Sequence, residues 1–182
     1  MSFLINPFAF LAAGGDFESI ATVTVGSGGA SSIEFTSIPG TYQHLQVRAL
    51  LKNSGGTTWY NADVNFNSDT GSNYSRHALY GSGSSAAALG QANQTKARVM
   101  DAVSGAKTYF GASVLDILDY ADTTKYKTIR CLSGDDQNGS GYINLESSLW
   151  MSASAITSIK ITSGFTSFVE HSTAALYGIK AP

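Results

Sequence analysis

Asparagine and aspartate side chains are spaced for cation binding in one stretch of this 182-residue chain. Asn65, Asn67 and Asp69 alternate along the sequence, and Gly71 follows two positions later. A calcium loop of the EF-hand type needs its glycine one position earlier and a glutamate near its twelfth position, where Arg76 stands. The spacing therefore favours a strand that runs into an Asx-rich turn over a metal site.

Carboxylates in pairs are the second chemistry to consider, because glycoside hydrolysis needs two carboxyl groups facing each other across a cleft. Asp116 and Asp119 lie three apart on a predicted strand, so they face opposite sides. The cluster of Asp135, Asp136 and Asn138 favours turn chemistry over cation binding. Nothing in the spacing of the glutamates selects a catalytic pair among Glu18, Glu34, Glu146 and Glu170.

Nucleophilic catalysis has equally little support. Cys131 is the single cysteine, so it forms no disulfide within the chain, and its strand-like surroundings predict a small buried apolar residue. The three histidines, His44, His77 and His171, are scattered along the chain. No Gly-x-Ser-x-Gly elbow and no phosphate-binding glycine loop is present. We therefore expect no catalytic residues, no metal and no cofactor.

Glycan binding remains open, because aromatic rings stack on sugar faces and Asn or Asp side chains supply hydrogen bonds. The rings that we name as candidates are Trp59, Tyr74 and Trp150. The alternative is that these aromatics pack in the core or on a sheet face, which is common in β-sandwiches.

The elements that must position these residues are strands. Apolar and polar residues alternate with a period of two in runs around 22–25, 32–36, 44–51 and 63–67. Glycine-, serine- and asparagine-rich turns separate the runs, and about ten strands are expected, with 86–97 the one stretch that could form a short helix. The sequence predicts one all-β domain over 16–182, an antiparallel β-sandwich most simply of the jelly-roll kind.

Residues 1–15 form a separate, strongly apolar arm. It is too short to span a bilayer, and the absence of Lys and Arg before Arg48 argues against a secretory signal. The arm either packs on its own domain or anchors the chain in a partner. The anchoring residues would be Phe3, Leu4, Ile5, Phe8, Phe10 and Leu11.

Composition narrows the partners further. Charged residues make up 13% of the chain and the formal net charge is −2, so no basic excess exists to neutralise a nucleic-acid backbone. Few charges and abundant Ser and Thr suit a domain that hides surface against neighbouring subunits.

Four segments, in their order and separations, resemble tailed-bacteriophage virion structural proteins of the tail-fibre or capsid-decoration type, common among marine and cyanobacterial phages. These segments are 33–48, 66–75, 116–127 and 175–180, and the resemblance spans about residues 20–180. It implies a non-enzymatic decoration, cement, tail or fibre subunit in the virion, assembled in the bacterial host cytoplasm as a ring or homotrimer. Its partners would be other capsid or tail proteins. A lectin-like module that reads a host-surface glycan is the alternative.

Overall fold

The computed structural model describes residues 16–180 apart from 57–58, 104–105, 137 and 165. The anchor arm predicted at 1–15 therefore lies outside the described residues. Twelve strands are formed in the described part, and none of its segments is a helix that could cross a bilayer. The strands are β1 (Phe17–Thr24), β2 (Ser32–Phe35), β3 (His44–Leu51), β4 (Trp59–Phe66), β5 (Tyr74–Gly81), β6 (Ala86–Gln94), β7 (Ala97–Val103), β8 (Gly111–Ile117), β9 (Lys127–Asp136), β10 (Gly141–Trp150), β11 (Ile159–Ser163) and β12 (Thr173–Ile179).

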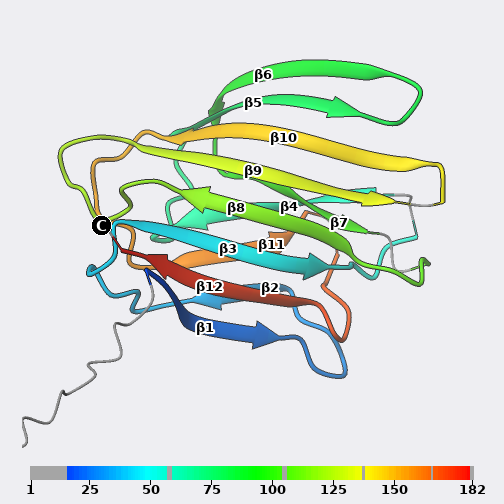
Figure 1. Ribbon diagram of the computed structural model, residues 1–182, viewed down its shortest axis with the longest axis horizontal. Coiled ribbons are helices and arrows are strands. Elements are labelled where there is room, and N and C mark those ends of the chain that lie inside the picture. The colour runs from blue at the N-terminus through cyan, green and yellow to red at the C-terminus, as the bar shows by residue number, and fades with distance from the viewer. Residues whose placement is uncertain (1–15, 57–58, 104–105, 137, 165, 181–182) are drawn as a thin grey trace, which may run out of the picture.

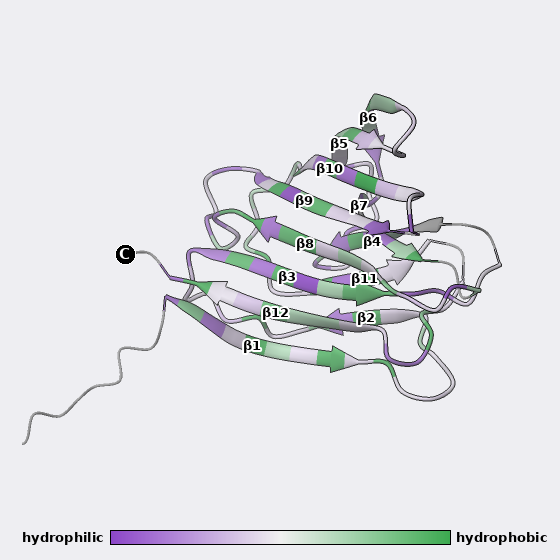
Figure 2. Cartoon of the chain, turned by 45° about the vertical axis from the view of Figure 1, so that its right-hand side comes forward, coloured by the Kyte–Doolittle hydropathy of each residue, from purple (hydrophilic) through white to green (hydrophobic). Residues whose placement is uncertain are grey.

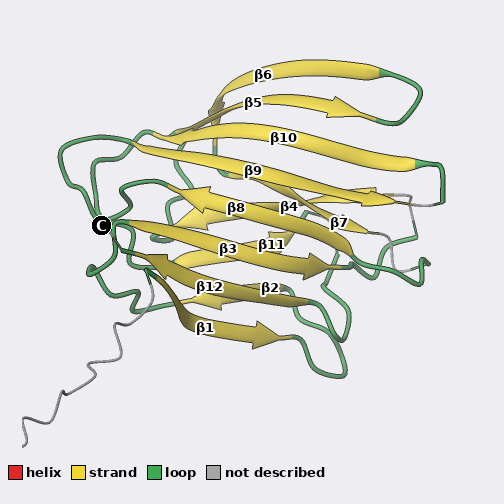
Figure 3. Ribbon diagram, in the orientation of Figure 1, coloured by secondary structure: helices red, strands yellow, loops and turns green. Residues whose placement is uncertain are grey.

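The strands form two stacked antiparallel sheets (Figures 1 and 3). The larger sheet has eight strands in the order β1-β12-β3-β8-β9-β10-β5-β6. The smaller sheet has four, in the order β2-β11-β4-β7. The predicted antiparallel β-sandwich is therefore confirmed, with more strands than the eight of a simple jelly roll.

The period-two pattern explains why each sheet has one buried face. In β3, the side chains of Leu45, Val47, Ala49 and Leu51 are buried, and the residues between them are more exposed. Figure 2 shows hydrophobic and hydrophilic segments following one another along the strands. The inward faces of both sheets meet in one continuous apolar core that includes Phe35, Phe66, Leu115, Ile129, Ile161 and Leu176. Burial of these side chains supplies the main driving force of folding.

The stretch 86–97, which the sequence left as a candidate short helix, is instead strand β6 followed by a turn into β7. The helix expectation is wrong because pairing with β5 along the whole of β6 overrides the helix propensity of its alanines. Asn93 lies at a φ of 55°, beside a shift in the β5–β6 register. Such a bulge is compatible with a strand edge and ends a helix.

The unequal size of the two sheets leaves part of the larger one uncovered. β7 is the edge of the smaller sheet, whereas β10 continues into β5 and β6 in the larger sheet. Figure 1 shows β5 and β6 at the upper edge, beyond β4 and β7. Accordingly, nearly every residue of β6 is exposed on both faces. The overhanging β5–β6 hairpin and β7 together wall a cleft.

Candidate functional site

The cleft is a cavity of about 360 Å³ between the overhang and the edge of the smaller sheet. Strands β5, β6 and β10 contribute one wall, and β4 and β7 contribute the other. Its lining is polar apart from one leucine and two tyrosine rings. The lining residues are Asn61, Arg76, Tyr80, Leu89, Gln91, Arg98, Tyr142, Asn144 and Glu146.

Arg76 and Glu146 form a buried ion pair in this cleft. Their side chains lie diagonally across β5 and β10, since the register pairs Arg76 with Ser148 and Glu146 with Ala78. The Arg76 Nη2 atom is 3.6 Å from Glu146 Oε1. Each side chain is less than a tenth exposed. Arg76 Nη1 donates a hydrogen bond of 3.0 Å to the carbonyl oxygen of Arg98, which fixes the guanidinium against β7.

Two atoms of this pair are left without a protein partner. Arg76 Nε is a donor with no acceptor, and Glu146 Oε2 is an acceptor with no donor. An unmatched buried polar group of this kind costs about 1–3 kcal/mol. The wall of the cleft therefore contains one buried donor and one buried acceptor, Arg76 Nε and Glu146 Oε2, that have no protein partner.

Burial raises the pKa of Glu146 to about 7, although the positive charge of Arg76 acts in the opposite direction. The negative charges of Asp101 and Asp63 add to the rise, and Arg98 offsets part of it. The net charge of the Arg76–Glu146 pair consequently changes near neutral pH, from +1 when Glu146 is protonated to zero when it is ionised.

Arg98 lies on β7, in the opposite wall of the cleft, and its side chain is held by a residue of the neighbouring strand β4. Its Nε donates a hydrogen bond of 3.2 Å to the fully buried carboxylate of Asp63, which also pairs with Lys96 at 2.6 Å. Two cations on one buried carboxylate fix the position of the Arg98 backbone and side chain. Each oxygen of this carboxylate thus faces a cation of the protein.

A second buried acid lies beneath the cleft. Asp101 accepts hydrogen bonds from Asn144 and, at 2.9 Å, from the hydroxyl of Ser133. Burial raises the pKa of Asp101, against the effect of these two hydrogen bonds. Because Asn144 donates to Asp101, its amide is held in one orientation where it lines the cleft.

The sequence candidates for sugar stacking are placed elsewhere. Tyr74 and Trp150 are buried in the core, where both rings pack against Phe66 with centroid separations of 6.3 and 5.6 Å. Their assignment as glycan-stacking residues is wrong, because neither ring face reaches solvent. Trp59 lies in β4 opposite Val103, and its side chain lies outside the described part of the structure.

Trp150 instead binds Asp69, the carboxylate of the Asx-rich turn. Asp69 accepts hydrogen bonds from Trp150 Nε1 at 2.7 Å, from the Gly71 amide at 2.8 Å and from the Asn73 side chain. Partial burial opposes ionisation, but these hydrogen bonds outweigh it and lower the pKa of Asp69. The carboxylate is therefore a turn anchor, as the turn interpretation expects.

Asn67 links the Asx-rich turn to a distant segment of the chain. In an Asx-rich turn, the side chain commonly bonds to the nearby backbone. The Asn67 side chain instead bridges to the segment before β11. Its Oδ1 atom accepts from the amides of Thr157 and Ser158 at 2.8 and 3.1 Å, and its amide donates to Ala155. Across the described residues, no cluster of three His, Cys, Asp or Glu side chains is arranged to hold a metal.

Cys131 is buried, as the sequence predicted, and burial raises the pKa of its thiol well above the usual value. Asp116 points to the outer face of the larger sheet, where it accepts from Gln46, and Asp119 lies in a turn beside His44 and Lys125. These two carboxylates do not converge. The carboxyl that lines the cleft, Glu146, was not selected by sequence spacing.

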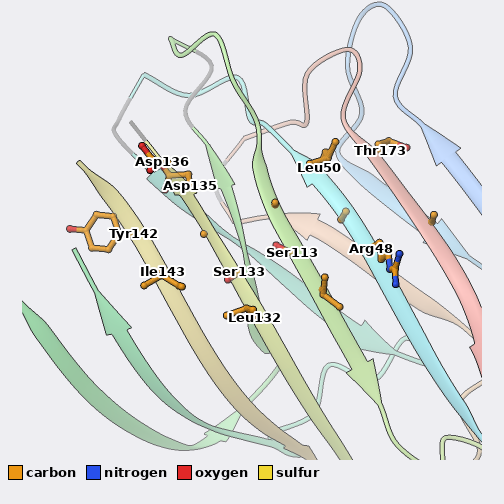
Figure 4. Close-up of a pocket in the computed structure, with 15 residues that line it drawn as sticks. Arg48, Leu50, Ser113, Leu132, Ser133, Asp135, Asp136, Tyr142, Ile143 and Thr173 are labelled. Carbon is orange, nitrogen blue, oxygen red and sulfur yellow. The ribbon is translucent and has the colours of Figure 1, made fainter. Parts of the chain in front are cut away.

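The outer face of the larger sheet carries a second, shallower feature. A hollow of about 700 Å³ lies over β3, β8, β9 and β10, and Figure 4 shows Leu50, Leu132 and Ile143 around it. Asp135 and Asp136 lie at one end of this hollow. Unlike the cleft, it is mostly apolar.

Comparison with known proteins yields two weakly similar structures. No family model and no curated protein matches the chain. The galectin LEC-6 of Caenorhabditis elegans aligns with a TM-score of 0.35 and 10% identity, over 86% of this chain and 95% of the galectin. The CBM40 of the Ruminococcus gnavus IT-sialidase, solved with alpha2,3 sialyllactose bound, gives a TM-score of 0.34 and 8% identity, over 90% and 94%. These values are too low to carry an argument about function.

Proposed function

We propose that this protein is a non-catalytic carbohydrate-binding module whose ligand occupies the cleft beneath the β5–β6 hairpin. The observation that carries the proposal is the buried Arg76–Glu146 pair, with one unmatched donor and one unmatched acceptor. A sugar hydroxyl both donates and accepts, so hydroxyls that enter the cleft are matching partners for the guanidinium and the carboxyl that line it. An apolar ligand would leave both unsatisfied.

The rest of the lining suits the same ligand class. Asn61, Gln91 and Asn144 supply amides with both donors and acceptors, and Tyr80 and Tyr142 supply ring surface. Carbohydrates combine hydroxyl edges with apolar C–H faces, so this mixture matches them on both counts. A volume of about 360 Å³ accommodates one or two sugar rings.

The same lining supports a binding role over hydrolysis. Glu146 is the single carboxyl among the described lining residues, whereas hydrolysis by the common mechanisms uses two. Asp63 is engaged by Lys96 and Arg98, and Asp101 by Ser133 and Asn144. The proposal therefore includes no catalytic residue.

A glycan array tests this proposal. Full-length protein should bind a restricted set of glycans, and Gln91→Ala and Tyr80→Leu should each reduce the signal about tenfold or more, which corresponds to one or two lost contacts. Gln43→Ala, an exposed glutamine near the opposite edge of the sheet, is the matched control and should bind as the wild type does. Absence of any dose-dependent signal from the wild type would refute the proposal.

A structural role in a bacteriophage virion, implied by the sequence resemblance, is the second candidate. The exposed apolar outer face of the larger sheet favours it, because such a face suits assembly with other subunits. The role is compatible with glycan binding in the cleft. Deletion of residues 2–13 should abolish incorporation into particles while the sandwich stays folded, and full occupancy of the truncated chain, measured by quantitative mass spectrometry of purified particles, would contradict the anchor.

A further inference from the structure

The outer face of the larger sheet exposes large aliphatic side chains in one line. The register places Val114, Leu132, Leu145 and Leu79 directly opposite one another across β8, β9, β10 and β5. Leu132, Leu145 and Leu79 are each more than half exposed. We call these four residues the ridge. A monomeric protein rarely exposes a contiguous apolar surface that extends over four neighbouring strands.

The neighbouring row of the same face is low. Two residues along each strand, Ala112 and Gly134 lie opposite each other, between Leu50 on β3 and Ile143 on β10. Position 134 requires glycine, because the Cβ of any other residue there would overlap the carbonyl oxygen of Tyr142. We call Ala112 and Gly134 the floor. Because neither carries a large side chain, they leave a hollow of about 700 Å³ on this face.

We propose that this face pairs with the same face of a second copy, about a two-fold axis that crosses the strands over Ser133. On β9, Leu132 and Gly134 lie one residue to either side of Ser133. A two-fold axis there exchanges the ridge row with the floor row. Leu132 then lies over Gly134 of the second copy and Val114 over Ala112 of the second copy, so these two ridge residues enter the other copy's hollow. Leu145 lies against Ile143 of the second copy.

The charges at the border of the face agree with this axis. Arg130 and Asp136 lie three residues to either side of Ser133 on β9, both exposed and both on the outer face. The same rotation places Arg130 over Asp136 of the second copy, and the pair occurs twice. Arg48, the other exposed cation nearby, is turned toward β1 and β12, where it lies over the rings of Phe17 and Tyr177 at 5.1 and 5.6 Å.

The area is sufficient for a modest dimer. The ridge and the hollow extend over six adjacent strands, from β12 to β5, which lie about 4.8 Å apart. Along the strands they extend over four rows of outward residues about 6.8 Å apart, which pass through Arg130, Leu132, Gly134 and Asp136 of β9. Together these outline roughly 500 Å² in each copy. The total of roughly 1,000 Å² is at the lower limit for a specific interface. Aligned sheet packing tolerates the crossing of about 30° that sheet twist imposes, with the best fit at the central strands.

Sedimentation equilibrium of the full-length protein tests the proposal. We expect a reversible monomer–dimer equilibrium, and Leu132→Asp should raise its dissociation constant at least about tenfold, because it buries a charge on the floor of the second copy. Tyr126→Asp is the matched control, since Tyr126 is equally exposed but lies before β9, outside the four rows. A chain that is monomeric at every concentration, or a trimer, would overturn the proposal.

Charge reversal tests the axis itself. Arg130→Asp alone and Asp136→Arg alone each set like charges against each other twice, so each should weaken the dimer about tenfold or more. The double variant restores opposite charges and should recover most of the affinity. Thermal unfolding of each variant checks that the fold is kept. A double variant as weak as the single ones would exclude this arrangement.

The arm at 1–15 is the competing occupant of the face. If it covered the ridge of its own chain, deletion of residues 2–13 would expose the face and increase association. If it held the copies together, the deletion would abolish association. Either result contradicts the proposal, which expects an unchanged dissociation constant for the truncated chain.

Discussion

At the residue scale, the cleft depends on Glu146 being held out of water beside a cation. Its environment is set by three strands, since β10 carries it, β5 supplies Arg76 and β7 supplies the carbonyl that orients Arg76. A carboxyl with a pKa of about 7 is neutral in a fraction of molecules at physiological pH. It then acts as both donor and acceptor toward a sugar hydroxyl.

The pH dependence of stability follows from that pKa. The pKa of Glu146 is higher in the folded protein than the ordinary value of 4.5, so its contribution to stability is fully present below about pH 4.5 and is lost as the pH rises through about 7. Glu146→Gln removes the ionisation. The free energy of unfolding of the variant, relative to that of the wild type, should therefore rise by on the order of 3 kcal/mol between pH 4.5 and pH 8. Urea unfolding at both pH values measures this difference. An equal difference at the two pH values would contradict this assignment.

Asp69 acts in the opposite direction, because its pKa is lowered in the folded state. Its contribution to stability is present above the ordinary value of 3.8 and is lost as the pH falls through the lower folded value. Asp69→Ala leaves the buried Trp150 Nε1 without its acceptor and should cost about 1–3 kcal/mol at pH 7. The exposed pair of Glu34 and Lys160 gives the control, since Glu34→Gln should leave the unfolding midpoint almost unchanged. An Asp69→Ala protein as stable as this control would rule out the anchoring role.

At the element scale, alternation predicts which segments are strands but not how the strands are ordered. The buried positions of β3 follow from the alternation at 44–51, because this strand is covered on one face throughout. The position of β5 between β10 and β6 depends on contacts between distant segments, which no local pattern contains. The helix expectation for 86–97 was wrong for the same reason.

The candidate site was less predictable than the fold. Glu146 has the same parity as Ser148 and Trp150 in β10, so its inward direction was available from the sequence once Trp150 was taken as core. Arg76 has the same relation to Tyr74 in β5. Two charged residues at inward positions of neighbouring strands would have indicated a polar site inside the sandwich. This was missed because Tyr74 and Trp150 were interpreted as exposed rings, which places Arg76 and Glu146 on the outer face.

Gly178 shows how one strand depends on a missing side chain. In β12, a Cβ at this position would overlap the ring of Tyr42, which covers the glycine from the loop before β3. Gly178→Ala should therefore destabilise the protein by about 1–3 kcal/mol in urea unfolding. Gly26→Ala is the control, because nothing lies within 4 Å of a Cβ there. Equal midpoints for the two variants would show that the Tyr42 ring moves aside without cost.

At the scale of the whole molecule, the two sheets give the protein two distinct surfaces. The overhang of the larger sheet forms a polar cleft on its inner side, and the outer side of the same sheet carries the apolar ridge and floor. β10 contributes to both, with Glu146 facing inward and Leu145 outward. Pairing through the outer face would leave both clefts open, so a dimer would present two binding sites and gain avidity toward a repeated glycan.

That arrangement predicts a difference between surface and solution binding. On a dense glycan surface, Leu132→Asp should dissociate faster than the wild type, because it binds through one cleft at a time. In solution, its affinity for a single soluble glycan should equal that of the wild type, since the cleft is unchanged. Surface plasmon resonance and calorimetry provide the two readouts, and parallel losses in both would contradict independent surfaces.

On our proposal, a carbohydrate binds between the β5–β6 hairpin and β7. The most direct measurement is a ¹H–¹⁵N NMR titration of the full-length protein with the glycan that gives the strongest array signal. We expect the backbone amide signals of Arg76, Gln91 and Glu146 to shift, and those of β1 and β12 to stay unchanged. Shifts confined to the outer face or to the turns, with the cleft amides unmoved, would contradict it.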